Sequence, residues 1–143
     1  MIKRDEFSIM EFFQPNKKSE EADNTYGDCT IRALCKALNK EWLEVFDMLV
    51  PLERKYQCPF PCMPKELYDK SFSELGFSKI TLPRVKKGEK RMTPLQWAIE
   101  HPKGIYILRM SAHFSCCYEG IVYDTWDCSK HAVYSVYQLK GEC

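Results

Sequence analysis

The sequence has no apolar run long enough to cross a membrane, and its first residues, MIKRDEFSIMEFF, are charged where an export signal needs an apolar stretch. We therefore expect a cytoplasmic protein that does not insert into membranes. Charge of one sign is also lacking: 21 Lys and Arg against 20 Asp and Glu give a net charge of +1, which argues against a nucleic-acid partner. Among only six glycines there is no Gly-rich loop of the kind that cradles phosphates, so nothing indicates a nucleotide site.

The remaining composition fits a single folded domain over residues 1–143. Hydrophobic residues make up 45% of the chain and aromatic residues 13%, which is enough for a core at this length. Eight cysteines would indicate disulfides in a secreted protein, but without an export signal we expect reduced thiols. Free cysteines are usually buried core residues, so a reactive one needs further evidence. The sequence gives no indication of the oligomeric state.

The spacing of apolar residues divides the chain into a helical part, about 24–100, and a sheet part, about 104–140. Helical spacing begins at Cys29, and a second helix beginning near residue 42 is expected to stop at Pro51. After Gly104 the pattern changes to short β-branched and aromatic runs: IYILRM, HFSCCY, IVYDTW and AVYSVYQL. This order predicts an α+β fold, with an N-terminal helical half packed on a C-terminal antiparallel β-sheet.

Cys29 stands where the first long helix begins, within the stretch DNTYGDCTIRALC. Asp28 occupies the N-cap position, where its carboxylate can accept hydrogen bonds from the amides of the first turn. A thiol is a weak nucleophile at its ordinary pKa of about 8.5, but a helix N-terminus and a nearby imidazolium both favour the thiolate. A nucleophilic cysteine therefore needs a histidine from elsewhere in the chain and a third group that orients it.

His113 is the histidine expected inside the sheet, and the alternation of side chains along strands suggests its partner. If Glu119-Gly120 is a two-residue turn, His113 shares a face with Asp124 and Trp126. A three-residue loop would bring Asp127 to that face instead, so Asp127 is the alternative third member of a triad.

The chain resembles the papain-like cysteine peptidases in this order of Cys, His and acid, and DTW resembles the Asn-Ser-Trp of papain. The resemblance implies that Asp124 orients His113 and that Trp126 shields their hydrogen bond from water. GDC and the helix after it also resemble the double-glycine-type peptidases that process bacteriocins. The combination GDCTIRALCKALNKEW, HPKGIYIL and GIVYDTWDCS resembles a group of small uncharacterised proteins from phages and bacteria.

The resemblance departs from the papain pattern before the cysteine, where papain-like enzymes carry an oxyanion-hole glutamine. Here the upstream polar residues are Asp23, Asn24 and Thr25. We expect Asn24 to donate its side-chain amide toward the oxyanion, together with the backbone N–H of Cys29.

These residues predict a papain-like cysteine hydrolase, a thiol peptidase that acts on peptide or isopeptide bonds of a peptide or protein substrate without a cofactor. The alternative is a phage or mobile-element effector on the same fold that binds a host protein without turnover. Cys29 and His113 could also be structural residues, although Gly27-Asp28 before the cysteine and a strand histidine with a downstream acid favour the catalytic interpretation. Asp124 and Asp127 could equally be turn and surface carboxylates. A zinc site built from Cys58, Cys62, Cys128 and His131 is a further alternative, disfavoured by the wide spacing of its first pair, and we expect no metal ligands.

Overall fold

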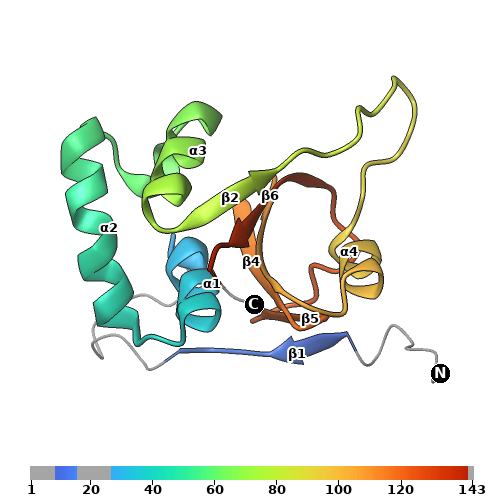
Figure 1. The fold of residues 1–143 in the computed structure, drawn as a ribbon, viewed down its shortest axis with the longest axis horizontal. Helices are drawn as coiled ribbons and strands as arrows, with labels where there is room; N and C mark the ends of the chain where they lie inside the picture. The colour runs from blue at the N-terminus through green and yellow to red at the C-terminus, as the bar shows by residue number, and fades with distance from the viewer. Residues whose placement is uncertain (1–8, 16–26, 142–143) are drawn as a thin grey trace.

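The computed structural model describes residues 9–15 and 27–141. A six-stranded mixed sheet runs through the molecule in the order β1-β5-β4-β3-β6-β2. Figure 1 shows its two edge strands, β1 and β2. Its strands are β1 (Met10–Phe12), β2 (Phe77–Ile80), β3 (Ile105–Met110), β4 (His113–Tyr118), β5 (Ile121–Asp124) and β6 (Val133–Leu139). All neighbouring strands are antiparallel except β1 and β5, which are parallel.

The expected antiparallel sheet from the last third of the chain is therefore only part of the observed one. β3 to β6 form it as predicted, but β1 adds a parallel edge beside β5 and β2 adds an antiparallel edge beside β6. Met10 pairs with Val122, and Phe12 pairs with Asp124. A three-residue strand whose partner lies in the last third of the chain leaves no periodic signal of its own, because its stability comes from the partner.

Two tight turns set the register of the central strands. Tyr118 pairs with Ile121 across Glu119-Gly120, which confirms the two-residue loop. Both turn residues have positive φ, 50° at Glu119 and 77° at Gly120, as a type I′ turn requires. Met110 pairs with His113 across the other turn, so His113 is the first residue of β4. The turns thus fix which face each β4 side chain occupies.

Four α-helices are present among the described residues: α1 (Cys29–Leu38), α2 (Trp42–Tyr56), α3 (Lys65–Glu74) and α4 (Pro94–Glu100). The expected end of the second helix at Pro51 is wrong, because α2 continues through this proline for five more residues. Pro51 is exposed, so water can solvate the carbonyl that loses its hydrogen bond, while Leu49 and Leu52 on either side remain buried in the core.

The core consists of two apolar clusters, because neighbouring strand residues point to opposite faces of the sheet. One cluster joins the sheet to α1, α2 and α3 and includes Leu34, Phe72 and Tyr137, all fully buried. The other lies on the side of α4 and includes Leu108 and Val122. Helix α1 packs against β4, and this contact brings the first residue of the helix to the first residue of the strand.

Candidate active site

The N-terminus of α1 is held by side chains rather than by a capping hydrogen bond. Asp28 is the N-cap residue, but its carboxylate does not bond to the first turn as we expected. It is buried and accepts hydrogen bonds from the Arg32 guanidinium and, at 3.2 Å, from the indole nitrogen of Trp42. These partners lie on α1 and α2, so Asp28 ties the start of α1 to its neighbour and fixes the position of Cys29.

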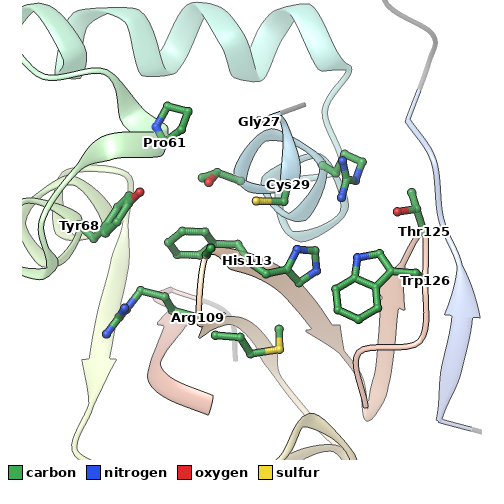
Figure 2. Close-up of a pocket in the computed structure, with 13 residues that line it drawn as sticks. Gly27, Cys29, Pro61, Tyr68, Arg109, His113, Thr125 and Trp126 are labelled. Atoms are coloured by element: carbon green, nitrogen blue, oxygen red, sulfur yellow. The ribbon is translucent and has the colours of Figure 1, made fainter. Parts of the chain in front are cut away.

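Cys29 lies half-buried in a pocket with a volume of about 420 Å³, which His113 and Trp126 also line (Figure 2). Burial of the thiol raises its pKa, but hydrogen bonds to the His113 side chain and the Phe114 backbone lower it. The positive charges of His113 and Arg32 lower it further, and the net pKa is below the ordinary thiol value. Burial raises the pKa of Cys35, Cys116 and Cys128 instead, so it is the environment of Cys29 that favours the thiolate.

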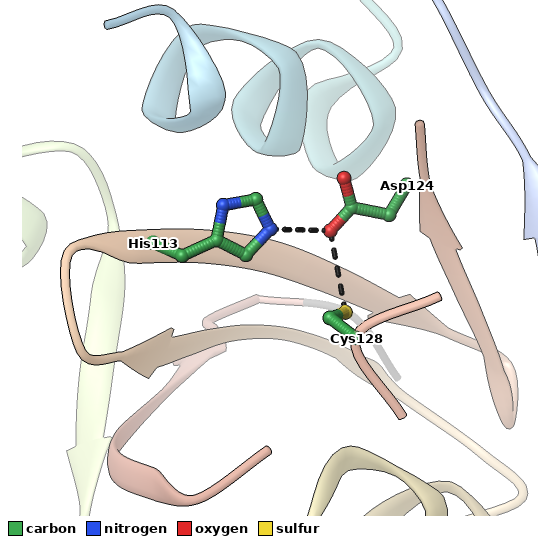
Figure 3. A group of neighbouring side chains, drawn as sticks. All are labelled: His113, Asp124 and Cys128. Carbon is green, nitrogen blue, oxygen red and sulfur yellow. Dashed lines mark hydrogen bonds and ion pairs between the residues drawn. The ribbon is translucent and has the colours of Figure 1, made fainter. Parts of the chain in front are cut away.

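His113 donates a hydrogen bond from Nε2 to Oδ2 of Asp124 at 2.6 Å (Figure 3). Burial of the imidazole would lower its pKa, but the Asp124 hydrogen bond, followed by contacts with Cys128 and Cys29, raises the pKa to about 11. Burial raises the pKa of Asp124, yet the hydrogen bond and charge of His113 bring it below its usual value. The pair is therefore an imidazolium and a carboxylate at neutral pH.

Asp124 is buried at the end of β5 and has partners on both of its oxygens. Oδ1 accepts the backbone N–H of Thr125 at 2.7 Å and lies 3.8 Å from Nη2 of Arg32. Arg32 therefore joins Asp28 at the start of α1 to Asp124 on the sheet. Arg32 thus contacts one carboxylate on its own helix and one across the domain.

Trp126 stands beside the His113 ring, with the ring centroids 4.8 Å apart and the planes tilted by 49°. The indole is 43% exposed, so one side faces solvent while the other covers the imidazole. His131, which follows in the same loop, contacts Trp126 edge-on. This is the position that we predicted for a side chain that shields the His113–Asp124 hydrogen bond.

The other predicted site residues fall outside this group. Asp127 accepts hydrogen bonds from the backbone and hydroxyl of Ser129, at 3.0 and 2.5 Å, and so closes a local turn instead of orienting His113. Asp127 is exposed, whereas Asp124 is buried beside the imidazole. Asn24, the predicted oxyanion donor, lies outside the described residues.

Cys128 is a further neighbour of Asp124, and this contact was not predicted from the sequence. Its buried thiol donates to Oδ2 of Asp124 at 3.3 Å, as Figure 3 shows. Burial raises the pKa of this thiol, so it remains protonated. The position of Cys128 four residues after Asp124, in a loop that turns back on the strand end, was the available signal.

The disfavoured zinc set of Cys58, Cys62, Cys128 and His131 does not assemble among the described residues. In residues 9–15 and 27–141, one group of three or more His, Cys, Asp or Glu side chains has its ligand atoms within 4.8 Å of one another: His113, Asp124 and Cys128. Such N, O and S donors suit zinc. A metal there would replace the His113–Asp124 hydrogen bond, because Nε2 of His113 and Oδ2 of Asp124, which form that bond, would bind the ion instead.

The comparisons with known proteins add no family to this geometry. A scan against protein-family models, a search of curated proteins and a search of solved structures each returned no match for this chain. Among the helices of the described residues, none is long and apolar enough to span a bilayer.

Proposed function

We propose that this chain is a papain-like cysteine hydrolase that acts on peptide or isopeptide bonds. The observation that carries the proposal is the convergence of Cys29 and His113 in one pocket, with Asp124 bonded to the imidazole, the pKa of the thiol lowered and that of the imidazole raised. Perturbed groups of this kind gathered in a concave site are typical of catalytic residues. The helix-first order and the packing of α1 on β4 support the papain-like assignment.

In the proposed reaction, the Cys29 thiolate attacks the substrate carbonyl carbon and forms a tetrahedral oxyanion. The bond from that carbon to the leaving nitrogen then breaks, and the imidazolium of His113 gives its proton to the amine. Water attacks the resulting thioester, with His113 now accepting the water's proton, and the acid product leaves Cys29. The backbone N–H of Cys29 at the α1 N-terminus, together with Asn24, would stabilise the oxyanion.

A reducing, cytoplasmic location fits this chemistry. The seven cysteines at described positions are all free, including the buried Cys35, Cys116 and Cys117. A thiolate nucleophile needs such conditions, because oxidation would remove it.

The proposal is tested first by labelling the native protein with iodoacetamide between pH 5 and 9 and quantifying each thiol by mass spectrometry. We expect Cys29 to react at pH 6 at least about tenfold faster than Cys62, which is exposed and serves as an internal control. The His113→Ala variant should lose this advantage, because the thiol keeps its burial but loses its hydrogen bond and countercharge.

Turnover is tested on a library of peptides from a digested proteome, with new chain ends detected by mass spectrometry. The native protein should generate ends that Cys29→Ala does not. If Cys29 labels no faster than Cys62 and no ends appear, the hydrolase is excluded, and the alternative of an effector that binds a host protein remains. The exposed Leu43 and Phe46 on α2 would then be the first residues to substitute in a binding assay.

A further inference from the structure

The pocket around Cys29 has two chemically different ends. Figure 2 shows Thr125 and Trp126 on one side of Cys29 and His113, and Tyr68 with Arg109 on the other. Thr125 and Trp126 belong to the triad side of the pocket. The Arg109 end takes no part in the proposed proton transfers, so its role has to be sought in what the pocket binds.

Arg109 is held in place by a neutral partner. It lies on β3 directly opposite Ser135 of β6, and its Nε and Nη2 donate to the Ser135 hydroxyl at 3.2 and 3.1 Å. Ser135 is buried and fixes the plane of the guanidinium. Charged side chains are rarely buried unless they are paired. Arg109 is half-buried, yet no ion pair links it to an acidic side chain in the part of the chain that the structure describes.

The other charged groups of the pocket have their own partners. Arg32 faces Asp28 and Asp124, and His113 faces Asp124 and the Cys29 thiolate. Tyr68, beside Arg109, donates its hydroxyl to the carbonyl of Phe60 at 2.6 Å, and burial raises its pKa to about 12, so it supplies no negative charge. The described residues that line the pocket include no Asp or Glu. Arg109 is therefore the lining cation whose charge no described acidic group offsets.

We infer that Arg109 binds a carboxylate of the substrate at the Tyr68 end of the pocket, an inference that rests on the proposed hydrolase. A guanidinium whose plane is fixed binds a carboxylate through paired, charge-assisted hydrogen bonds. The carboxylate comes from an acidic side chain near the cleaved bond or from the C-terminus of the substrate chain. Arg109 is then a specificity residue, and substrates that carry neither an acidic side chain nor a free C-terminus at this position are cleaved slowly.

The charge selectivity can be measured at Cys29 without a known substrate. The probes are N-propylmaleimide, which is neutral, and 3-maleimidopropionate, which carries a carboxylate a few atoms from the reacting carbon. Rate constants for Cys29 are compared in the native protein, in Arg109→Gln and in Arg91→Gln. Arg91 is the matched control, because its guanidinium carbon lies over the same Tyr134 ring as that of Arg109, 4.5 Å against 5.9 Å from the ring centroid, but it does not line the pocket.

We expect Arg109→Gln to lower the ratio of anionic to neutral rate constants about fivefold, whereas Arg91→Gln changes it less than about twofold. Arg109→Lys keeps the charge but not the paired donors, so it should retain part of the ratio. It also controls for a fold defect in the glutamine variant. An unchanged ratio in Arg109→Gln, or an equal fall in Arg91→Gln, would overturn the inference. Slow reaction of Cys29 with the neutral probe in the native protein would instead overturn the hydrolase itself.

Two peptides separate the sources of the carboxylate by their protection of Cys29 from the neutral probe. N-acetyl-Ala-Glu-Ala-amide offers only a side-chain carboxylate, and N-acetyl-Ala-Ala-Ala with a free acid offers only a chain end. We expect one of them to protect the native protein better than N-acetyl-Ala-Gln-Ala-amide, and this protection should be lost in Arg109→Gln. Equal protection by all three peptides would contradict a carboxylate site.

Discussion

Nε2 of His113 lies 2.6 Å from Oδ2 of Asp124, and this contact determines which ring nitrogen is left for Cys29. With Nε2 donating to the carboxylate, Nδ1 is the nitrogen available to the thiol. The orientation of the imidazole therefore depends on Asp124, and the charge of the carboxylate sustains the imidazolium that favours the thiolate.

Asp124→Asn should lower the pKa of His113 from about 11 by several units, because the amide keeps a similar shape but loses the negative charge. The measurement is an NMR titration of the His113 Cε1 proton, assigned with His113→Gln. Asp127→Asn is the matched control and should leave the titration unchanged, since Asp127 bonds to Ser129. A shift in the Asp127 variant that equals the Asp124 shift would contradict the assignment of Asp124 as the orienting residue.

The free energy of unfolding should depend on pH through His113. Its pKa is raised from 6.5 in the unfolded chain to about 11, so its stabilising contribution is complete below pH 6.5 and is lost as the pH rises toward 11. Asp124, with a lowered pKa, contributes above pH 3.8 and loses its contribution as the pH falls.

In a Cys29→Ser background, which removes the thiol titration, His113→Gln should lower the free energy of unfolding by about 2 kcal/mol between pH 4 and 6.5 and by progressively less above pH 6.5. Urea unfolding across this range gives the comparison, and a cost independent of pH would refute it.

Arg32→Gln should destabilise the fold by about 3 kcal/mol, because it removes the positive partner of a buried carboxylate at Asp28. Urea unfolding measures the loss, and the double variant Asp28→Asn with Arg32→Gln should recover part of it. Lys55→Gln breaks an exposed ion pair with Glu74 and is the control, with little change expected. If Arg32→Gln and Lys55→Gln lower the free energy of unfolding equally, the Arg32–Asp28 pair contributes no more than an exposed ion pair.

Glu119→Asn should stabilise the protein by roughly 0.5 kcal/mol, because Glu119 has φ of 50° in a type I′ turn that favours Asn-Gly. Glu119→Val should have the opposite effect, since a β-branched residue is strained at positive φ. Thermal unfolding followed by circular dichroism distinguishes the two. Stabilisation by both substitutions, or by neither, would argue against the turn type.

Local features of the site could be predicted from the sequence, and non-local ones could not. The His113–Asp124 proximity follows from one turn length and the alternation of strand residues, both of which act within a dozen positions. The parallel pairing of β1 with β5 depends on residues from opposite parts of the chain, and no spacing rule links them. By residue type Cys128 suggested only the disfavoured zinc set, whereas its contact with Asp124 depends on how the loop after β5 turns.

The prediction for Pro51 failed for a different reason. A proline inside a helix costs a hydrogen bond, and this rule, applied to the sequence alone, ends the helix. It does not account for the burial of Leu49 and Leu52, which keeps the segment on the core while the proline faces water. Tertiary packing outweighed the local preference.

Residues 10–12 are synthesised early but pair with residues 122–124. Cys29 is also synthesised early, whereas His113 and Asp124 come from the last third of the chain. On the ribosome the thiol emerges without the imidazolium and countercharges that lower its pKa. The nascent chain therefore carries an ordinary cysteine, and the groups that lower its pKa reach it only when α1 packs against β4. The order of synthesis thus delays the reactivity of this thiol until the fold is nearly complete.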